Sequence, residues 1–177
     1  MIEGPLLIRP YREEDAGALY DAVRESVSEV SQWLPWCHEN YSLSESREFT
    51  SSRAIAAQGD EWYSFAIFER ESGRFLGGVG LNFINRVHQL ANLGYWVRTS
   101  AAGRGVATGA TRAVARFGFA QLGLKRIEIV AAVNNLSSQR VAEKAGAVRE
   151  GLLRKRLLIR GEAHDAVLFS LVAEDLV

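Results

Sequence analysis

The amino-acid sequence predicts an α/β fold in which a central mixed, mostly antiparallel sheet of about seven strands carries helices on both faces. The 177 residues fit one domain, which we place at 1–177. Apolar residues recur at strand spacing in seven segments and at helical spacing in four. Only 93–97, 106–122 and 127–133 form a strand–helix–strand unit, whose two strands should run parallel. The other strands should be antiparallel.

The first third of the chain predicts one strand and two helices. A short apolar run at 6–8 indicates a strand, and apolar positions at helical spacing indicate a helix over 16–27. Ser42 and Glu45 have the spacing of a capping box and predict the start of the second helix. Gly59 is expected to end that helix.

The rest of the chain predicts the sheet and two further helices. We expect strands at 62–68, 75–84, 93–97, 127–133, 152–159 and 166–172, and helices at 106–122 and 136–145. Gly123 and Gly146 follow the two helices, where a glycine commonly ends a helix. Arg160, Gly161 and Glu162 predict a tight turn between the last two strands.

Composition excludes several classes of protein. The chain has 21 Lys+Arg and 21 Asp+Glu, and this zero net charge argues against general nucleic-acid binding, although a local basic patch is compatible with it. The single cysteine, Cys37, excludes an intramolecular disulfide and a cysteine-only zinc site, and we expect no metal. No apolar run reaches about 18 residues and no secretory signal is visible, so we expect a soluble, cytoplasmic protein without a membrane segment.

A glycine-rich segment joins the strand at 93–97 to the long helix. Gly103 and Gly105 give the backbone freedom to approach a ligand, and the first N–H groups of the helix have no partner within it. These features together suit a pyrophosphate, although a tight turn without a ligand explains the glycines equally well. Thr108 stands where a dinucleotide-binding Gly-x-Gly-x-x-Gly motif needs its third glycine, and about 90 residues precede the unit, which disfavours that motif. No Gly-Lys-Ser or Gly-Lys-Thr of a Walker A loop follows.

A second polar segment begins at the end of the strand at 127–133. A capped amphipathic helix explains its general pattern, from Asn134 to Gly146. Two adjacent asparagines and two serines at the carboxyl end of a core strand also mark the place where open α/β sheets bind ligands.

Six motifs carry a resemblance to a known family. They are Leu34-Pro35-Trp36, Gly94-Tyr95-Trp96-Val97, Gly103 to Thr108, the pattern Asn135-x-x-Ser138-x-Arg140-Val141-x-Glu143-Lys144-x-Gly146, Glu150 to Arg154, and the hairpin from Gly161 to Leu171. In this order and spacing, nearly the whole chain resembles the GNAT superfamily of acyl-CoA-dependent N-acetyltransferases, within it the RimL/RimJ-like group of ribosomal-protein N-terminal acetyltransferases.

The resemblance implies a sheet whose strands at 93–97 and 127–133 splay apart around acetyl-CoA, the cosubstrate. The pyrophosphate would lie on the glycine turn, and the pantetheine would pair with the strand at 93–97. The residues that would bind the cosubstrate are Tyr95, Trp96, Val97, Gly103, Arg104, Gly105, Val106, Ala107, Thr108, Asn135 and Arg140. Ala102 replaces the arginine or glutamine that the family usually has there, while Arg104 still offers a charge.

The resemblance also implies direct attack of a neutral amine on the thioester, with Ser138 donating a proton to the leaving thiolate. Asn135 would bind a pantetheine amide or order a water. Alternatively, Ser138 only caps or hydrogen-bonds within its helix, and Asn135 is only a turn residue at the end of a strand. Asn92 replaces the glutamate that many members use as a base, and an amide cannot accept the ammonium proton at neutral pH. The base could instead be a water held by Asn92 or Asn135, or the side chain of His88 or Glu128. The simpler role of His88 is that of a solvated loop residue, and the simpler role of Glu128 is that of an ion-pair partner.

Trp33, Trp36 and Tyr41, with His88, are the residues expected to line the acceptor side, unless the aromatic residues only cover the core. Adjacent Cys37 and His38 make a poor covalent-catalysis pair, and a histidine–aspartate pair at 164–165 is expected to form hydrogen bonds near the last turn.

Three functions follow from these alternatives. The first is acetylation of a primary amine. We favour a protein N-terminal α-amine over a small-molecule amine such as an antibiotic or polyamine, because the sequence has no acidic run that would attract a polycation. The second is a non-catalytic acyl-CoA-binding module, and the third, disfavoured, is a dinucleotide oxidoreductase. The sequence leaves open whether the chain acts alone or as a homodimer.

Overall fold

The computed structural model describes residues 1–56 and 62–176, so the expected helix end at Gly59 lies outside the described residues. Eight strands form one sheet in the order β1-β2-β3-β4-β5-β6-β8-β7. Their bounds are Ile2–Glu3 (β1), Leu6–Pro10 (β2), Tyr63–Glu69 (β3), Phe75–Asn85 (β4), Leu90–Val97 (β5), Arg126–Ala132 (β6), Val148–Ile159 (β7) and Glu162–Leu171 (β8). Every neighbouring pair is antiparallel except β5 and β6. The predicted mixed, mostly antiparallel sheet is confirmed.

Five α-helices accompany the sheet in the described part of the chain: α1 (Ala16–Glu25), α2 (Val27–Val30), α3 (Leu43–Ala56), α4 (Val106–Leu122) and α5 (Leu136–Ala145). The predicted capping box at the start of α3 is present, because the Ser42 N–H donates to Glu45 Oε2 at 2.9 Å and the Glu45 N–H donates to Ser42 Oγ at 3.3 Å. Gly123 and Gly146 end α4 and α5 with φ of 67° and 101°. These positive angles suit glycine and explain why both helices end where the sequence predicts.

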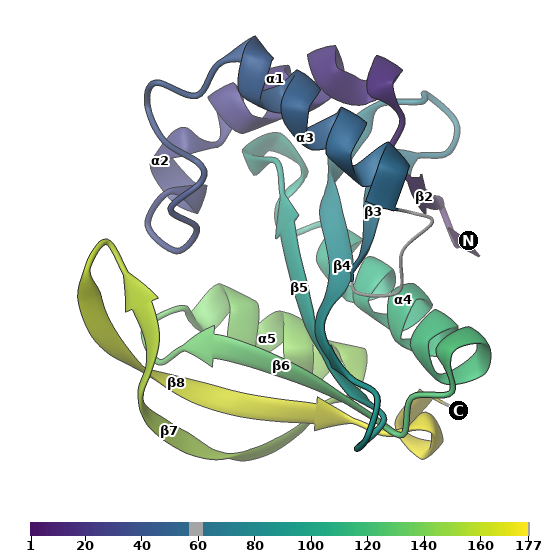
Figure 1. Ribbon diagram of the computed structural model, residues 1–177, viewed down its shortest axis with the longest axis vertical. Helices are drawn as coiled ribbons and strands as arrows, with labels where there is room; N and C mark the ends of the chain where they lie inside the picture. The colour runs from purple at the N-terminus through teal and green to yellow at the C-terminus, as the bar shows by residue number, and fades with distance from the viewer. Residues whose placement is uncertain (57–61, 177) are drawn as a thin grey trace.

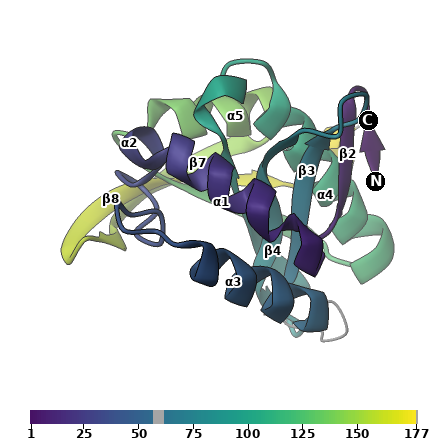
Figure 2. The same cartoon turned by 90° about the horizontal axis from the view of Figure 1, so that it is seen from above.

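The helices cover both faces of the sheet (Figures 1 and 2). Strand alternation on β3 shows how the two cores are divided, since successive side chains point to opposite faces. Phe65 and Ile67 belong to the core that α4 covers, whereas Ala66 and Phe68 belong to the core on the side of α1 and α3.

The sheet splits between β5 and β6. These strands pair only from Leu90 to Asn92 against Arg126 to Glu128. Beyond this point β5 remains paired with β4 as far as Val97, and β6 remains paired with β8 as far as Ala132. The two halves of the sheet therefore diverge, as Figure 1 shows for β5 and β6. This divergence exposes one edge of β5 over the residues that the sequence analysis assigned to a cosubstrate.

Candidate active site

The start of α4 presents free backbone N–H groups next to the end of β5. A 3₁₀ turn at Thr99–Ala101 leads into Gly103 and Gly105, whose φ angles of 74° and 78° lie in the left-handed region. A β-carbon at either glycine would meet nothing within 4 Å, so the backbone conformation, not lack of space, calls for glycine. The residues from 102 to 105 are exposed and no side chain caps the helix. The positive end of α4, which is 17 residues long, is therefore open to an anion.

The turn is held in place from the α1 side of the sheet. The Ser100 N–H donates to Glu25 Oε1 at 2.8 Å, and Arg98 Nε donates to Glu25 Oε2 at 3.0 Å. The Thr99 N–H donates to Ser26 Oγ at 3.0 Å. Hydrogen bonding from Arg98 lowers the pKa of Glu25 to about 2. The conformation of the turn before α4 thus depends on a carboxylate that the sequence analysis did not identify, since Glu25 is 75 residues away from Ser100.

Replacing Glu25 with glutamine should lower the free energy of unfolding by about 1–3 kcal/mol at neutral pH, because the folded state holds this carboxylate in its charged form. The folded-state pKa is lower than the unfolded value, so the contribution is complete above about pH 5 and is lost as the pH falls toward 2. Urea denaturation from pH 7 to pH 3 measures it. The difference between wild type and Glu25→Gln should shrink as the pH falls.

Glu29→Gln is the matched control. The Glu29 carboxylate accepts a hydrogen bond from Thr99 Oγ1 at 2.9 Å, but no arginine among residues 1–56 and 62–176 forms an ion pair with it. An equal and pH-independent loss in both variants would contradict the role given to Glu25.

Arg104, beside the open helix end, forms an ion pair with Glu69. Its Nη2 lies 3.2 Å from Glu69 Oε1, and both residues border a cavity of about 280 Å³ between β2 and α4. The charge that the sequence analysis expected Arg104 to offer is thus shared with Glu69. Arg140 lies exposed on α5, two residues beyond Ser138.

A pair of hydroxyl groups joins β5 to α5 across the split. Tyr95 Oη donates to the Ser138 carbonyl at 2.8 Å and lies 3.1 Å from Ser138 Oγ. Burial raises the pKa of Tyr95 to about 12, so its hydroxyl stays protonated at neutral pH. Asn135 caps α5 by accepting a bond from the Ser138 N–H at 3.0 Å. The structure therefore brings together Tyr95, Asn135 and Ser138. The contact of the Tyr95 hydroxyl with Ser138 is one that the sequence analysis did not identify.

Asn92 lies on the other face of β5. Alternation places Asn92 with Trp96, which packs against the α1–α3 core, whereas Tyr95 packs against the core beneath α4. The Asn92 side-chain N–H donates to Asn82 Oδ1 on β4 at 2.8 Å. Neither amide can act as a base at neutral pH.

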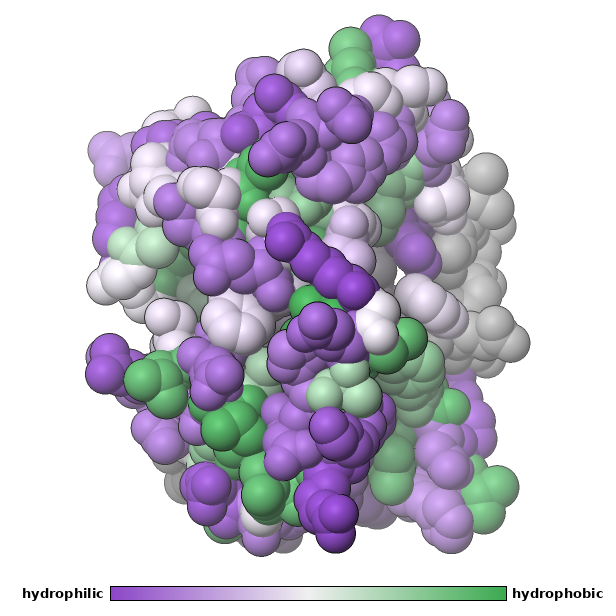
Figure 3. Space-filling view, turned by 90° about the vertical axis from the view of Figure 1, so that its left-hand side faces the viewer, coloured by the Kyte–Doolittle hydropathy of each residue, from purple (hydrophilic) through white to green (hydrophobic). Residues whose placement is uncertain are grey.

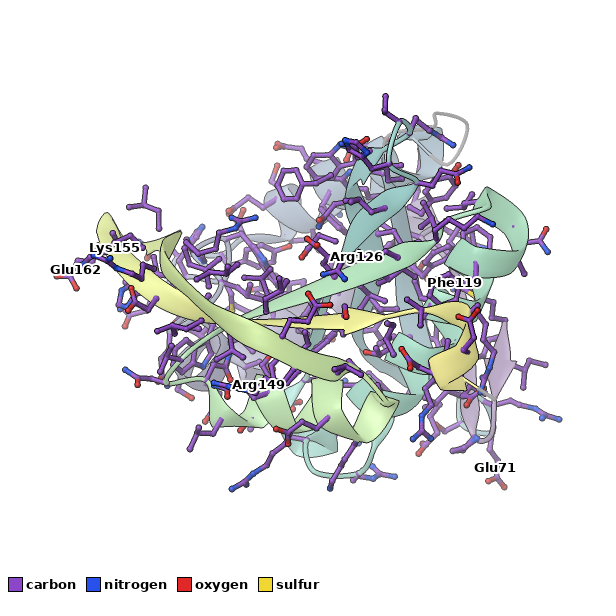
Figure 4. All side chains as sticks on the ribbon, turned by 90° about the horizontal axis from the view of Figure 1, so that it is seen from below. Glu71, Phe119, Arg126, Arg149, Lys155 and Glu162 are labelled. Carbon is purple, nitrogen blue, oxygen red and sulfur yellow. The ribbon has the colours of Figure 1, made fainter. Side chains whose placement is uncertain are left out.

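Glu128 lies next to Asn92 in the β5–β6 register and is committed to an ion pair. Arg126 Nε lies 2.9 Å from Glu128 Oε1, and the Arg126 Nη1 donates to Glu150 Oε1 at 2.7 Å. Ser170 Oγ also donates to Glu150 Oε1 at 2.7 Å. Figure 4 shows Arg126 within this half of the sheet. The ion-pair role considered for Glu128 is the one that the structure shows.

His88 lies apart from the aromatic residues that the sequence analysis grouped with it. It occupies the exposed turn between β4 and β5, where its N–H donates to Asn85 Oδ1 at 2.9 Å. This turn lies at the closed end of the split. Trp36 and Trp96, in contrast, have ring centroids 5.3 Å apart, and Tyr41 packs on Trp36 at 6.4 Å. The aromatic cluster thus joins the segment before α3 to β5.

A second cavity, of about 410 Å³, lies at the carboxyl end of β6. It is lined by Gln32, Trp33, Ala132, Val133, Asn134, His164 and Asp165. Trp33 comes from the segment after α2, and the histidine and aspartate come from β8. Arg160 ties these walls together, because its Nη2 donates to the carbonyl and to Oγ of Ser31, each at 3.1 Å. Asn134, in the cavity wall, directly precedes Asn135, the residue that caps α5.

Cys37 and His38 do not form a reactive pair. The thiol is buried and its pKa is raised by desolvation, while His38 Nε2 lies 2.9 Å from Glu45 Oε1. In residues 1–56 and 62–176, no three His, Cys, Asp or Glu side chains gather to hold a metal ion. No helix in those ranges is long and apolar enough to cross a membrane.

The sheet splits between β5 and β6, the uncapped start of α4 lies after β5, and a cavity lies at the end of β6. This arrangement fits a class of enzymes that hold an acyl thioester between two diverging strands. The chain belongs to the GNAT acetyltransferase family, because the family's acetyltransferase domain profile matches residues 5–148. Its members are acyltransferases, and acetyl-CoA is their cosubstrate.

Individual relatives agree with this family. YjcK of Bacillus subtilis, assigned as an N-acetyltransferase, is 34% identical over 178 residues, which cover 99% of this chain and 98% of YjcK. A Vibrio cholerae structure, assigned as a ribosomal-protein-serine acetyltransferase, is 31% identical with a TM-score of 0.84, covering 97% of this chain and 95% of that one. RimL, a ribosomal L7/L12 α-N-protein acetyltransferase solved with coenzyme A, shares the fold at 23% identity and a TM-score of 0.87, covering 100% and 98%.

Proposed function

We propose that the protein transfers the acetyl group of acetyl-CoA to the α-amine of a protein N-terminus. The observation that carries this proposal is the Tyr95–Ser138 hydroxyl pair, which bridges β5 and α5 across the split of the sheet. The resemblance to ribosomal-protein acetyltransferases supports a protein as the acceptor.

Acetyl-CoA supplies a thioester whose carbonyl carbon an amine can attack, and the described residues fit it. The exposed N-terminus of α4 can receive the pyrophosphate, and the free edge of β5 can pair with the pantetheine amides. Ser138, with Tyr95 beside it, would be the residue that faces the sulfur of the bound thioester. Ser138 Oγ can donate its proton to the thiolate as it leaves and take back the proton that the acetylated amine loses, while Tyr95 Oη, 3.1 Å away, holds that hydroxyl in place.

The residues at the site offer no clear general base to take the proton from the attacking amine. Asn92 is an amide, and Glu128 is paired with Arg126. An acceptor that is already partly neutral at physiological pH therefore suits this site best. An α-amino group titrates at about 7.7–8.0 and a lysine at about 10.4, so about 200–300 times more of the α-amine is neutral at pH 7.5.

The acceptor preference is a direct test. A peptide with a free N-terminus should be acetylated at least about 100-fold faster, in kcat/KM, than the same peptide with a blocked N-terminus and one free lysine. Thiol release from acetyl-CoA measures both, with a polyamine and an aminoglycoside as further acceptors. Faster turnover of the lysine, the polyamine or the aminoglycoside would overturn the proposal. So would binding of acetyl-CoA, seen as a rise in Tm, without turnover of any amine.

A further inference from the structure

The β7–β8 hairpin concentrates positive charge in a chain that is neutral as a whole. Residues 148–162 contain five basic residues and two acidic ones in a chain with 21 of each sign. The basic residues are Arg149, Arg154, Lys155, Arg156 and Arg160, and the acidic ones are Glu150 and Glu162. Glu150 is already paired with Arg126. The hairpin therefore carries a local excess of positive charge that composition alone does not reveal.

Three of these residues lie in a bulge beside the cavity at Trp33. The β7–β8 register shifts between Leu153 and Leu157, and Lys155 has a φ of 52°. The Lys155 N–H donates to Asp165 Oδ1 at 2.8 Å. Asp165 also lines the cavity at Trp33, so one carboxylate forms part of the cavity wall and holds the bulge. The bulge, which we define as residues 154–156, is thereby fixed at the edge of the cavity.

The side chains of the bulge are available to a partner. Arg154, Lys155 and Arg156 are exposed, and among the described residues none of the three forms an ion pair. Figure 4 places Lys155 and Glu162 at the outer end of the hairpin, but no contact within salt-bridge distance joins them. Leu152 and Leu158, on either side, are 54% and 72% exposed. Figure 3 shows hydrophilic and apolar side chains side by side on the lower half of this face.

We propose that the bulge binds an acidic segment of the acceptor polypeptide while the N-terminal residue of that polypeptide occupies the cavity. This inference rests on the proposed function and adds the class of acceptor to it. Opposite charge brings the segment to the bulge, and apolar side chains of the acceptor can contact Leu152 and Leu158. An extended chain advances about 3.3 Å per residue, so the third to sixth positions of the acceptor extend about 7–17 Å beyond its first residue, and we place the acidic side chains there.

An acidic polypeptide fits better than a nucleic acid because the patch is small and continuous with the cavity. A phosphate backbone would need a longer basic track than three residues, since nucleic-acid affinity grows with the number of phosphates neutralised. The cavity, moreover, ends in an amine-acetylating site, to which a peptide can deliver its own N-terminus.

The experiment compares two peptides that share their first two residues and carry either glutamate or glutamine at positions three to six. Wild-type protein should favour the glutamate peptide by about tenfold in kcat/KM, mainly through KM, and the preference should weaken in high salt. Arg154→Glu/Arg156→Glu should reduce the ratio to about one or below. It leaves Lys155, whose positive φ forms the bulge, unchanged.

Arg47→Glu/Arg70→Glu is the control with the same change of charge, because both residues are exposed and lie on α3 and on the β3–β4 turn. It should keep the tenfold preference. Equal turnover of both peptides by the wild type would overturn this inference and leave the proposed function standing, whereas turnover of neither would overturn both. A single-stranded RNA that binds the wild type but not the double variant, with no peptide preference, would assign the bulge to nucleic acid instead.

Discussion

Gly77→Ala should be among the most destabilising single substitutions in this protein, lowering the free energy of unfolding by about 3 kcal/mol or more. A β-carbon at Gly77 would lie 2.2 Å from the carbonyl oxygen of Trp96 and 2.9 Å from the α-carbon of Val97. Both neighbours are backbone atoms of β5, so no change of side-chain rotamer can relieve the contact. In a chain of this length, the loss corresponds to a fall in Tm of about 10 °C.

The same substitution should weaken the binding of acetyl-CoA. Gly77 pairs with Val97, the last residue of β5, and Arg98 then starts the path into the turn before α4. A displacement of β5 there moves the edge and the helix start that we assign to the cosubstrate. Thermal denaturation measures the loss of stability, and a rise in the KM for acetyl-CoA measures the weaker binding.

Two other glycines serve as controls. Gly151→Ala on β7 should change stability by less than about 0.5 kcal/mol, because no atom lies within 4 Å of the added carbon and its φ is not positive. Gly78→Ala should fall between the two, because its β-carbon would meet movable side-chain atoms, Tyr11 Oη at 2.4 Å and Trp96 Nε1 at 2.8 Å. Equal stability of the Gly77 and Gly151 variants would show that β4 and β5 pack less closely than described.

Local signals predicted most of the fold because they act over a few residues. The long helix with its glycine end, the capping box before α3 and the turn at Arg160 and Gly161 depend on neighbours in the sequence. The turn has φ of 52° and 83° at these two positions, as a type I′ hairpin requires.

Tertiary pairing determined the parts that the sequence did not predict. The two-residue strand β1 exists only because Ile2 and Glu3 pair with Leu7 and Leu6, and two residues show no periodicity. The strand expected at 152–159 begins at Val148, since two register shifts interrupt its alternation.

The same distinction applies to the site. The glycine turn was visible because positive φ restricts the residue type at Gly103 and Gly105. The contact between Tyr95 and Ser138 joins residues 43 positions apart, and only the split of the sheet sets this distance. The pair of His164 and Asp165 was expected to form hydrogen bonds near the last turn. Asp165 does so with the Lys155 N–H at 2.8 Å, and both residues also line the cavity at Trp33. Neither residue's type nor its spacing could indicate such neighbours.

Ser138→Ala should reduce kcat by about 100-fold while leaving the KM for acetyl-CoA within about threefold, because a proton donor to the leaving group acts in the transition state. The substitution keeps the cap of α5, since Asn135 accepts from the backbone N–H of Ser138 and not from its hydroxyl. A loss of turnover would therefore not reflect a frayed helix. Steady-state kinetics with an N-terminal peptide measure both constants.

Tyr95→Phe should reduce kcat by about tenfold, and the double variant should lose little more than Ser138→Ala alone. The two hydroxyls lie 3.1 Å apart and share one hydrogen-bonding path, and residues that act as a unit show non-additive losses. Ser137→Ala, an exposed serine in the same helical turn, is the control and should stay within about twofold of wild type. If the Ser138 and Tyr95 losses simply multiply, the hydroxyls act independently. If Ser138→Ala instead raises only the KM for acetyl-CoA, Ser138 binds the cosubstrate without donating the proton.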